Sequence, residues 1–393
     1  MTARSESAAP NRIDLPHLLA GLAWLAGLWF AMLRLPLLNV AANRLVPGHP
    51  VVGADALGWT GAAIAAASLA GLVLTMIRDG RRFALVAAAG FTVALLILAE
   101  GLGSGAARNL AGAAPAARAS LGAGSWLALA LLGGGLGFAV RRSRVRWLGL
   151  AVGLGLGLGL AALAHAGRLD ALSLAVEYAA RHEAVQAAIR EHLVLAGSAL
   201  AIAIAGAVPL SLWRRGQGLV AMLVGGIQVV PAVALLGALV ALTAGLLRAV
   251  PALRETGLSA LGAAPAVAGI AAYLLLPLWR GIGLAMRSPD AAAIEAAEAV
   301  GLTRRQILLG IRLPLGAPIL VGALRVAAVQ GLGLATLGAL VGAGGLGRIV
   351  FDGMAQFAPD LILLGAVPVV ALSLGAEIGL SRLEAAARRR WHP

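Results

Sequence analysis

The sequence predicts an all-α integral membrane protein of about ten transmembrane helices, with both termini in the cytoplasm. Three observations lead to this fold class. Hydrophobic residues make up 60% of the 393 positions and charged residues 12%, and the mean hydropathy is +0.92. The apolar residues form segments of roughly 20, the length that crosses about 30 Å of hydrocarbon. The arginines gather in the loops between alternate segments.

The apolar segments follow one another along the chain, separated by short polar loops. The stretch near 151–160 alternates glycine with leucine, and glycine is common in membrane helices because small residues allow close packing. The expected spans are 17–36, 57–77, 82–101, 122–140, 147–166, 193–213, 219–242, 263–285, 317–341 and 361–381.

The positive charges set the orientation of these spans. All 31 Lys+Arg residues are arginine, and the formal net charge is +14. With ten spans, the arginine-rich loops all fall on one face, which the positive-inside rule makes cytoplasmic. The charge is therefore explained by topology, and no nucleic-acid partner is expected. The main clusters are Arg78, Arg81 and Arg82; Arg141, Arg142, Arg144 and Arg146; Arg214 and Arg215; Arg287, Arg304, Arg305 and Arg312; and Arg388, Arg389 and Arg390.

The first apolar segment has a second interpretation, as a secretory signal with Val40-Ala41-Ala42 as its cleavage site. Its apolar stretch is longer than a usual signal core, and its removal would break the alternation of charge. A retained span is therefore favoured over a signal.

Several absences narrow the chemistry. A chain without lysine has no Walker A motif, and a chain without cysteine has no disulfide or thiolate nucleophile. His182-Glu183 begins like a zinc-protease motif, but Gln186 stands where the second histidine is needed. The six histidines are expected to be solvated surface residues. No catalytic residue and no metal site is predicted.

One stretch of twenty residues stands out, between the segments 263–285 and 317–341. It has the pattern E-A-A, three residues, G, nine residues, I-x-L-P. E-A-A alone is common in an alanine-rich chain, and it recurs at Glu384-Ala385-Ala386 without the rest of the pattern. The seven specified positions are Glu295, Ala296, Ala297, Gly301, Ile311, Leu313 and Pro314.

The residues before the glycine predict a short helix. Ser288 is a suitable N-cap, Pro289 suits the first turn, and Asp290 complements the positive end of the helix dipole. Gly301 stands where a left-handed C-terminal stop is needed. The helix is therefore expected to end in a tight glycine turn.

A second short helix is predicted directly after this turn. Thr303 and Gln306 have capping-box spacing at its start. Pro314 is expected to end this helix, and Pro318 to open the next span. The two helices would form a compact, rigid element between two spans.

The seven-residue pattern resembles the signature cytoplasmic loop of bacterial ABC-importer permeases. The resemblance implies that a separate ABC ATPase subunit, carrying ATP and magnesium, docks on the loop at 287–316. It also implies an extracytoplasmic substrate-binding protein and a second permease copy or related permease. The expected location is the bacterial plasma (inner) membrane, and no cofactor is expected in this chain.

The C-terminal half is similar to the permease subunits of glycine betaine/carnitine/choline-type importers, which take up osmoprotectants, and to the subgroup with extra N-terminal spans. The resemblance implies an accessory membrane region at 1–190 and a five-helix permease domain at 191–393. The segments that carry it are His192-Leu193, Ser198, Pro209-Leu210, Gln228–Ala232, Ala234–Leu236, Leu276–Arg280, Gly322–Arg325, and Ala335-Thr336 leading to Gly342–Gly347.

Two prolines indicate bends inside predicted spans. Pro231 and Pro277 free backbone carbonyls, which is tolerated where a cavity or a neighbouring helix satisfies them. With Gln228 and Arg280, they are candidates for the translocation path or its bends, with simple packing kinks as the alternative. The sequence departs from the family after Arg280, where Gly281-Ile282 replaces the usual Asn-Thr.

Two charged residues near the inner ends of the last two spans need an explanation. A charge at the bilayer centre costs about 2.5–3.5 kcal/mol on insertion scales. Arg325 and Glu377 are therefore expected to reach the interface or to pair with each other.

Two further segments are expected outside the membrane. The stretch 168–192 has mixed charges and predicts a helix, either on the membrane surface or leading into the sixth span. The run Gly342–Gly347 fits the dinucleotide-binding spacing G-x-G-x-x-G, but it follows a span rather than a strand. It is interpreted as a flexible, closely packed turn near the pore mouth.

Three other functions compete with an osmoprotectant permease. The first is an ABC permease for an amino acid or an oxyanion. The second is a stand-alone secondary transporter, which usually has two related halves and ionisable groups at mid-membrane. The third is an intramembrane enzyme. The sequence has no related halves and no catalytic set, so the latter two are disfavoured.

Overall fold

The computed structural model describes residues 15–43, 46–77 and 80–391. The chain divides into two compact units, Met1–Ala180 and Arg181–Pro393. Each unit has its own hydrophobic core.

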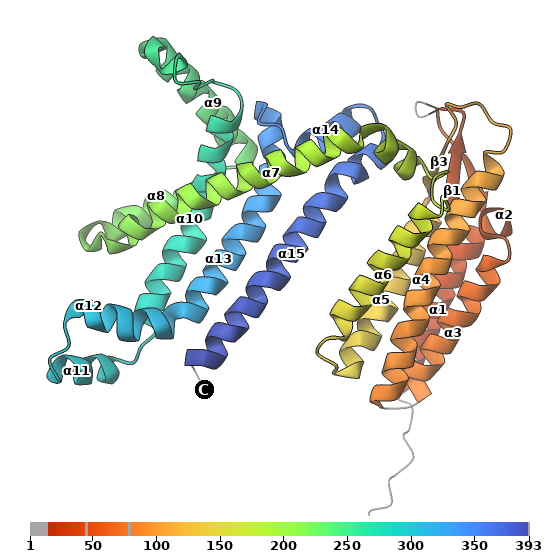
Figure 1. Cartoon of the computed structure of the whole chain (residues 1–393), viewed down its shortest axis with the longest axis horizontal. Coiled ribbons are helices and arrows are strands. Elements are labelled where there is room, and N and C mark those ends of the chain that lie inside the picture. Colours follow the sequence, from red (N-terminus) through yellow and green to blue (C-terminus); the bar gives the residue numbers. More distant parts are fainter. Residues whose placement is uncertain (1–14, 44–45, 78–79, 392–393) are drawn as a thin grey trace, which may run out of the picture. The chain divides into compact units, whose positions relative to one another are not determined.

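The first unit is a bundle of helices with α4 (Arg81–Asn109) at its centre (Figure 1). α3 (Thr60–Ile77), α5 (Ala123–Ser143) and α6 (Leu148–His165) all contact α4, and α1 (Leu15–Arg34) packs on α3 and α5. In lipid no hydrophobic driving force brings helices together, so their association depends on close packing of their side chains. The ring of Phe91 illustrates this fit: it is buried, it meets Trp24 edge-on at 5.6 Å, and Gly135 leaves room for it.

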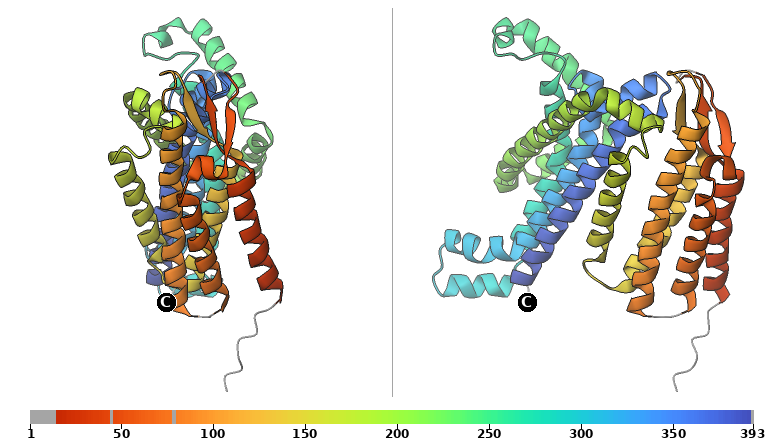
Figure 2. Two further views of the ribbon diagram at one scale, coloured as in Figure 1. Left: turned by 90° about the vertical axis from the view of Figure 1, so that its right-hand side faces the viewer. Right: turned by 45° about the vertical axis from the view of Figure 1, so that its right-hand side comes forward.

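A small antiparallel sheet lies at one end of this bundle (Figure 2). Its order is β2 (His49–Val52), β1 (Pro36–Ala41), β3 (Arg118–Leu121), and the short helix α2 (Gly53–Leu57) follows β2. The sheet is an addition to the predicted all-helical fold. Leu37 and Leu38 extend the apolar run of α1 and are fully buried, so hydropathy favoured a longer span. Pro36, the first residue of β1, was the signal that the helix ends at Arg34.

The second unit is built on α10 (Ala263–Arg287), α13 (Leu313–Ala335) and α15 (Pro359–Trp391). α13 lies between the other two and contacts both (Figure 1). The remaining elements are α7 (Ser173–Leu212), which begins before the unit boundary, η1 (Arg214–Gly216), α8 (Gln217–Val229), α9 (Ala232–Ala249), η2 (Pro251–Arg254), α11 (Ala291–Ala299), α12 (Arg304–Ile307), the π-helical η3 (Leu308–Arg312), η4 (Thr336–Val341) and α14 (Leu346–Ala355).

Among the described residues, 8 helices are long and apolar enough to cross a membrane, so the count of ten is not confirmed. The predicted spans 17–36 and 57–77 correspond to α1 and α3, of which Leu19–Arg34 and Thr60–Gly71 count as shorter apolar helices. The predicted span 219–242 is wrong as a single helix, because it breaks between α8 and α9. Pro231 has no N–H to continue a helix, and it forces Val230 into an extended conformation with ψ 128°.

The predicted connector at 168–192 is helical and leads into the sixth span. From Ser173 it is continuous with that span as the single element α7, and the backbone departs from helical angles at Arg181 (φ −136°, ψ 16°). Of the two alternatives for this segment, the lead into the span is the one observed.

Within each unit, several of the arginine-rich segments lie at one end. In the first unit the start of α4, with Arg81 and Arg82, and the α5–α6 turn lie opposite the sheet, and Arg78 lies outside the described residues. In the second unit α11 and α12 lie at the end where α15 finishes (Figures 1 and 2). This agrees with the positive-inside prediction, which makes these ends cytoplasmic.

Candidate functional site

The predicted loop between α10 and α13 starts with a capped helix, although the cap is not the predicted one. Asp290 is the N-cap of α11, and its Oδ1 accepts a hydrogen bond from the N–H of Ala292 at 3.3 Å. Ser288 instead follows the end of α10, where its Oγ donates to the carbonyl of Ala285 at 2.9 Å. Pro289 therefore precedes the cap, and the carboxylate of Asp290 serves both as cap and as partner of the helix dipole.

The glycine turn has the predicted left-handed conformation. Gly301 has φ +81°, its N–H donates to the carbonyl of Glu298 at 3.0 Å, and the N–H of Leu302 donates to that of Ala297 at 3.1 Å. These two bonds form a Schellman motif, which satisfies carbonyls that the end of α11 would leave unpaired.

The second helix begins with the predicted capping box. Gln306 N–H donates to Thr303 Oγ1 at 3.3 Å, and Thr303 N–H donates to Gln306 Oε1 at 2.8 Å. The expected helix end at Pro314 is wrong, because α12 passes through η3 directly into α13. Pro314 is the second residue of α13, directly after the π-helical turn η3, and Pro318 lies inside the helix rather than at its start.

The base of the loop is held tightly by α10 and α13. Arg312 Nη1 donates to the carbonyl of Met286, which ties the start of α13 to the end of α10. A β-carbon at Gly316 would lie 2.6 Å from the carbonyl oxygen of Ala285, and one at Gly281 would lie 2.2 Å from the β-carbon of Ala323. Only glycine permits these backbone approaches. The loop therefore rests on a rigid pair of helices.

The seven pattern residues do not lie on one surface. Glu295, Ala296 and Gly301 are exposed on the loop, whereas Ala297 is buried. The other three, Ile311, Leu313 and Pro314, are half-buried near its base.

The loop also exposes apolar side chains that the pattern does not include. Val300 is 77% exposed and Leu309 53%, on a loop at the cytoplasmic end of the unit. Apolar groups exposed there are typical of a protein–protein contact. In the sequence, Val300 stands directly before Gly301, the predicted helix end. An apolar residue at that place was the signal from which an exposed contact could have been predicted.

The candidate path residues Gln228, Pro231 and Pro277 meet through Tyr273. Pro277 cannot donate to the carbonyl of Tyr273 within α10, and Gln228 Nε2 donates to that oxygen instead, at 2.8 Å. In return, the Tyr273 hydroxyl donates to the carbonyl of Val230, where α8 ends before Pro231. Each proline-related break thus has its free carbonyl satisfied by the other helix. Tyr273 is buried, and the sequence interpretation missed it.

Arg280 does not join this group. It is exposed on α10, and no partner for it is found among the residues that the structure describes. Pro231 is exposed as well.

The Tyr273 hydrogen bond is expected to stabilise the bend. Tyr273→Phe should lower the free energy of unfolding by about 1 kcal/mol, the usual net value of one hydrogen bond, and reduce transport. Thermal unfolding in detergent and solute uptake would measure these effects. The other tyrosine, Tyr178, is 48% exposed and supplies the control, Tyr178→Phe, which should change neither. Equal behaviour of the two variants would contradict the role of this bond.

The glycine-rich run Gly342–Gly347 is fixed to α7. Gly345 N–H donates to Glu191 Oε2 at 2.8 Å, and a β-carbon at Gly345 would lie 3.3 Å from His192 Cα. His192 is fully buried, with Nε2 2.9 Å from the carbonyl oxygen of Leu332. Two expectations are thereby corrected. His192 is not a solvated surface residue, and the turn at Gly342–Gly347 is held in place by its hydrogen bond to Glu191 rather than flexible. It follows a 3₁₀-helix, not a strand, which does not fit a dinucleotide site.

Arg325 and Glu377 form the pair that was one of the two expected outcomes. Arg325 Nη1 contacts Glu377 Oε1, and Arg325 Nη2 lies 3.2 Å from Glu384 Oε2. Arg388 completes the group with an Nη2–Oε1 distance of 2.8 Å to Glu384. The group joins α13 to α15 and contains two positive and two negative charges.

Comparison with known proteins identifies this architecture. The family described as binding-protein-dependent transport system inner membrane component matches residues 197–389. A carnitine transport permease of Listeria monocytogenes is 32% identical over 198 residues, covering 49% of this chain and 84% of the relative. The chain belongs to this family of transport-system permeases.

The N-terminal unit has a match of its own. Residues 17–175 of the permease match the family described as the N-terminal domain of the ABC transporter permease YehY. A choline transport system permease of Bacillus subtilis (strain 168) is 28% identical over 47% of this chain and 79% of the relative. A solved structure of the MetNI methionine ABC transporter covers 52% of this chain and 94% of its own, with 22% identity and a TM-score of 0.43.

Membership of this family defines the type of activity. The permease is a transport subunit of the inner membrane and not an enzyme, because ATP hydrolysis in such systems belongs to a separate subunit. Permeases of ABC importers work with an ATPase and a substrate-binding protein.

Proposed function

We propose that this permease carries a quaternary-amine osmoprotectant such as glycine betaine, choline or carnitine into the cell. The observation that carries the proposal is the 32% identity over 198 residues with a permease named for carnitine transport. Relatives named for choline and for glycine betaine/carnitine/choline transport support the same class of solute.

Solute selection is assigned to the partner binding protein. Quaternary ammonium groups are usually held by aromatic faces, and only 4% of this chain is aromatic. The permease would then offer a weak path along its interface with a second permease copy. We place this path near the bend at Gln228, Pro231 and Pro277, with Arg280 exposed further along the same helix as Pro277.

The loop at 287–316 is proposed to transmit the action of the ATPase subunit, which binds ATP and magnesium. Its Schellman turn, its capping box and the bond from Arg312 to Met286 make it a rigid element. Its exposed residues, Glu295 and Gly301 together with Val300 and Leu309, offer a surface for that contact. Ala297, Ile311, Leu313 and Pro314 would hold this surface in shape.

The turn at Gly301 supplies a sharp test of this role. A β-carbon at Gly301 meets nothing within 4 Å, so within this chain a substitution acts through backbone conformation. Gly301→Val should reduce the ATPase subunit that co-purifies by about tenfold or more, because β-branched residues strongly disfavour positive φ. Gly301→Asn should retain most of it, since asparagine tolerates this conformation. Co-expression with the neighbouring ATPase and purification in mild detergent would measure the amounts.

Two results would contradict the proposal. One is an ATPase that stays on the Val variant at the wild-type level, and the other is the absence of an ATPase from the wild type. The solute is tested separately, in proteoliposomes of the full assembly. Labelled betaine, choline and carnitine should be taken up in preference to amino acids and oxyanions, and the reverse preference would overturn the osmoprotectant assignment.

A further inference from the structure

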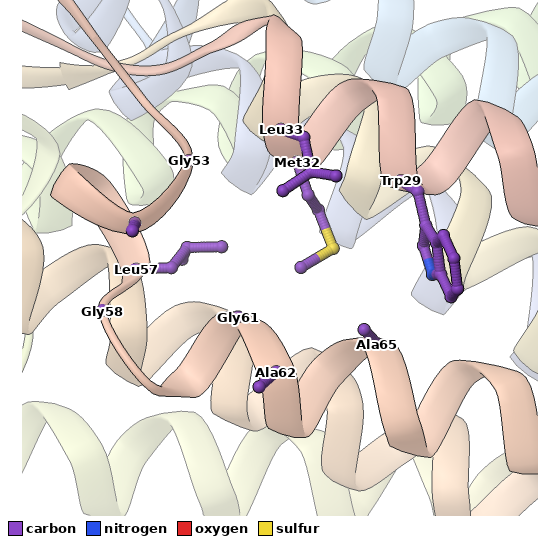
Figure 3. Close-up of a pocket in the computed structure, with 10 residues that line it drawn as sticks. Trp29, Met32, Leu33, Gly53, Leu57, Gly58, Gly61, Ala62 and Ala65 are labelled. Atoms are coloured by element: carbon purple, nitrogen blue, oxygen red, sulfur yellow. The ribbon is translucent and has the colours of Figure 1, made fainter.

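The N-terminal unit contains a groove of about 370 Å³ between α1 and α3, within the size range of small-molecule sites (Figure 3). Trp29, Met32 and Leu33 line it from α1. Gly53, Ala54, Leu57 and Gly58 line it from α2 and its ends, and Gly61, Ala62 and Ala65 from α3. In Figure 3 the Met32 and Leu57 side chains reach into the space between the helices, and Gly61 and Ala65 leave it open.

The groove is apolar and lies at the outer end of the bundle. Its lining contains no charged side chain. Leu33 is the residue before Arg34, the last residue of α1, and β1 follows directly. Trp59, beside Gly58, is 78% exposed. Because tryptophan is enriched where membrane meets water, Trp59 also indicates the outer surface of the membrane. The groove thus faces the boundary between acyl chains and headgroups.

Two guanidinium groups lie at this same end. Arg34 is exposed and adjoins the groove residue Leu33. Arg108 is exposed in the last turn of α4, where its Nη2 donates to the carbonyl of Ala56 at 3.3 Å. That Nη2 also lies 3.4 Å from the position of a β-carbon at Gly58, in the groove wall. The positive-inside rule explains arginines at the opposite end, but not these two.

We propose that the groove binds one anionic phospholipid of the outer leaflet. An acyl chain would lie along Met32, Gly61 and Ala65, and the phosphate would be held by Arg108 and Arg34. Guanidinium is well suited to phosphate because its donors match the phosphate oxygens. The site would anchor the N-terminal unit to a particular lipid, independently of the solute that the permease carries.

The test uses the full-length chain, purified in detergent with equal amounts of phosphatidylglycerol and phosphatidylcholine and examined by native mass spectrometry. Wild type should retain one phosphatidylglycerol per chain. Gly61→Leu should reduce this retention at least fivefold, because the added side chain fills the groove. The matched control is Gly133→Leu on α5, where a β-carbon meets nothing within 4 Å, and it should retain the lipid.

Arg108→Gln tests the contact with the headgroup separately from the contact with the acyl chain. It should keep a bound lipid but lose the preference for phosphatidylglycerol. Equal retention of the two lipids by wild type would overturn the proposal, and so would unchanged retention in Gly61→Leu. A Gly61→Leu variant that loses a second protein copy instead of lipid would assign the groove to self-association. Ala65→Leu is the second filling variant, in case Gly61→Leu does not fold.

Discussion

Replacing Gly281 with asparagine is expected to prevent α10 and α13 from packing. A β-carbon at this position would lie 2.2 Å from the β-carbon of Ala323, far closer than such atoms approach, and neither atom belongs to a flexible side-chain end. The helices would have to separate along the base of the loop at 287–316. Overpacking of this kind costs about 1–3 kcal/mol, and more where the backbone must shift. We expect Gly281→Asn to yield little folded permease and no uptake.

The control lies two residues further along the same helix. A β-carbon at Gly283 would meet only Arg287 Nη2, at 3.3 Å, and that is the movable end of a long side chain. Gly283→Asn should therefore fold. Yield and thermal unfolding of the two variants in detergent give the comparison, and a stable Gly281→Asn protein would show that α10 and α13 do not need their close approach.

The same contact bears on a departure noted in the sequence. Resemblance to osmoprotectant permeases predicted Asn-Thr after Arg280, and Gly281-Ile282 stands there instead. In this chain, Ala323 occupies the space that the asparagine side chain would need. Close packing therefore requires glycine at position 281 of this chain, whereas Ile282 in place of threonine has no structural explanation.

Removal of the Arg325 side chain is expected to have the second large effect. Arg325→Ala would leave Glu377 without its partner and Glu384 with Arg388 alone. The Glu384 side chain is only 14% exposed, so its charge is poorly solvated. Breaking a buried pair from one side typically costs about 3–5 kcal/mol, whereas an exposed pair contributes about 0–1 kcal/mol. The side chains of Arg325 and Glu377 are 28% and 42% exposed, so we expect an intermediate cost of about 2 kcal/mol. Thermal unfolding and uptake should both decline.

Two further variants separate loss of pairing from loss of an arginine as such. Arg348→Ala removes an exposed arginine from α14 and should leave stability unchanged. Arg325→Met combined with Glu377→Gln and Glu384→Gln removes the unpaired charges and should recover part of the stability. If Arg325→Ala alone folds and transports like wild type, the charge group does not hold α13 to α15.

The local features of the loop at 287–316 could be predicted from the sequence, because each depends on residues a few positions apart. The left-handed Gly301 and the Thr303–Gln306 capping box are of this kind. The choice of Asp290 over Ser288 as cap was missed, because both residue types are good caps and the end of α10 decides between them.

Features that depend on distant contacts could not be predicted. His192 looked like a surface histidine, and its burial depends on Leu332, 140 positions away. The sheet needs strands β1 and β3 from separate parts of the chain. The break between α8 and α9 was visible as Pro231, but hydropathy alone favoured one continuous span.

The exchange of hydrogen bonds around Tyr273 makes Gln228, Tyr273 and Pro277 interdependent. The Gln228 amide has its acceptor only while Pro277 leaves the carbonyl oxygen of Tyr273 unbonded within α10. Gln228 and Tyr273 stand 45 positions apart in the sequence. A change of Pro277 to an ordinary helical residue would give that oxygen a donor within its own helix and leave the glutamine amide without its acceptor. Substitutions at positions 228, 273 and 277 should therefore be non-additive, so that homologues of this permease would change these residues as a set.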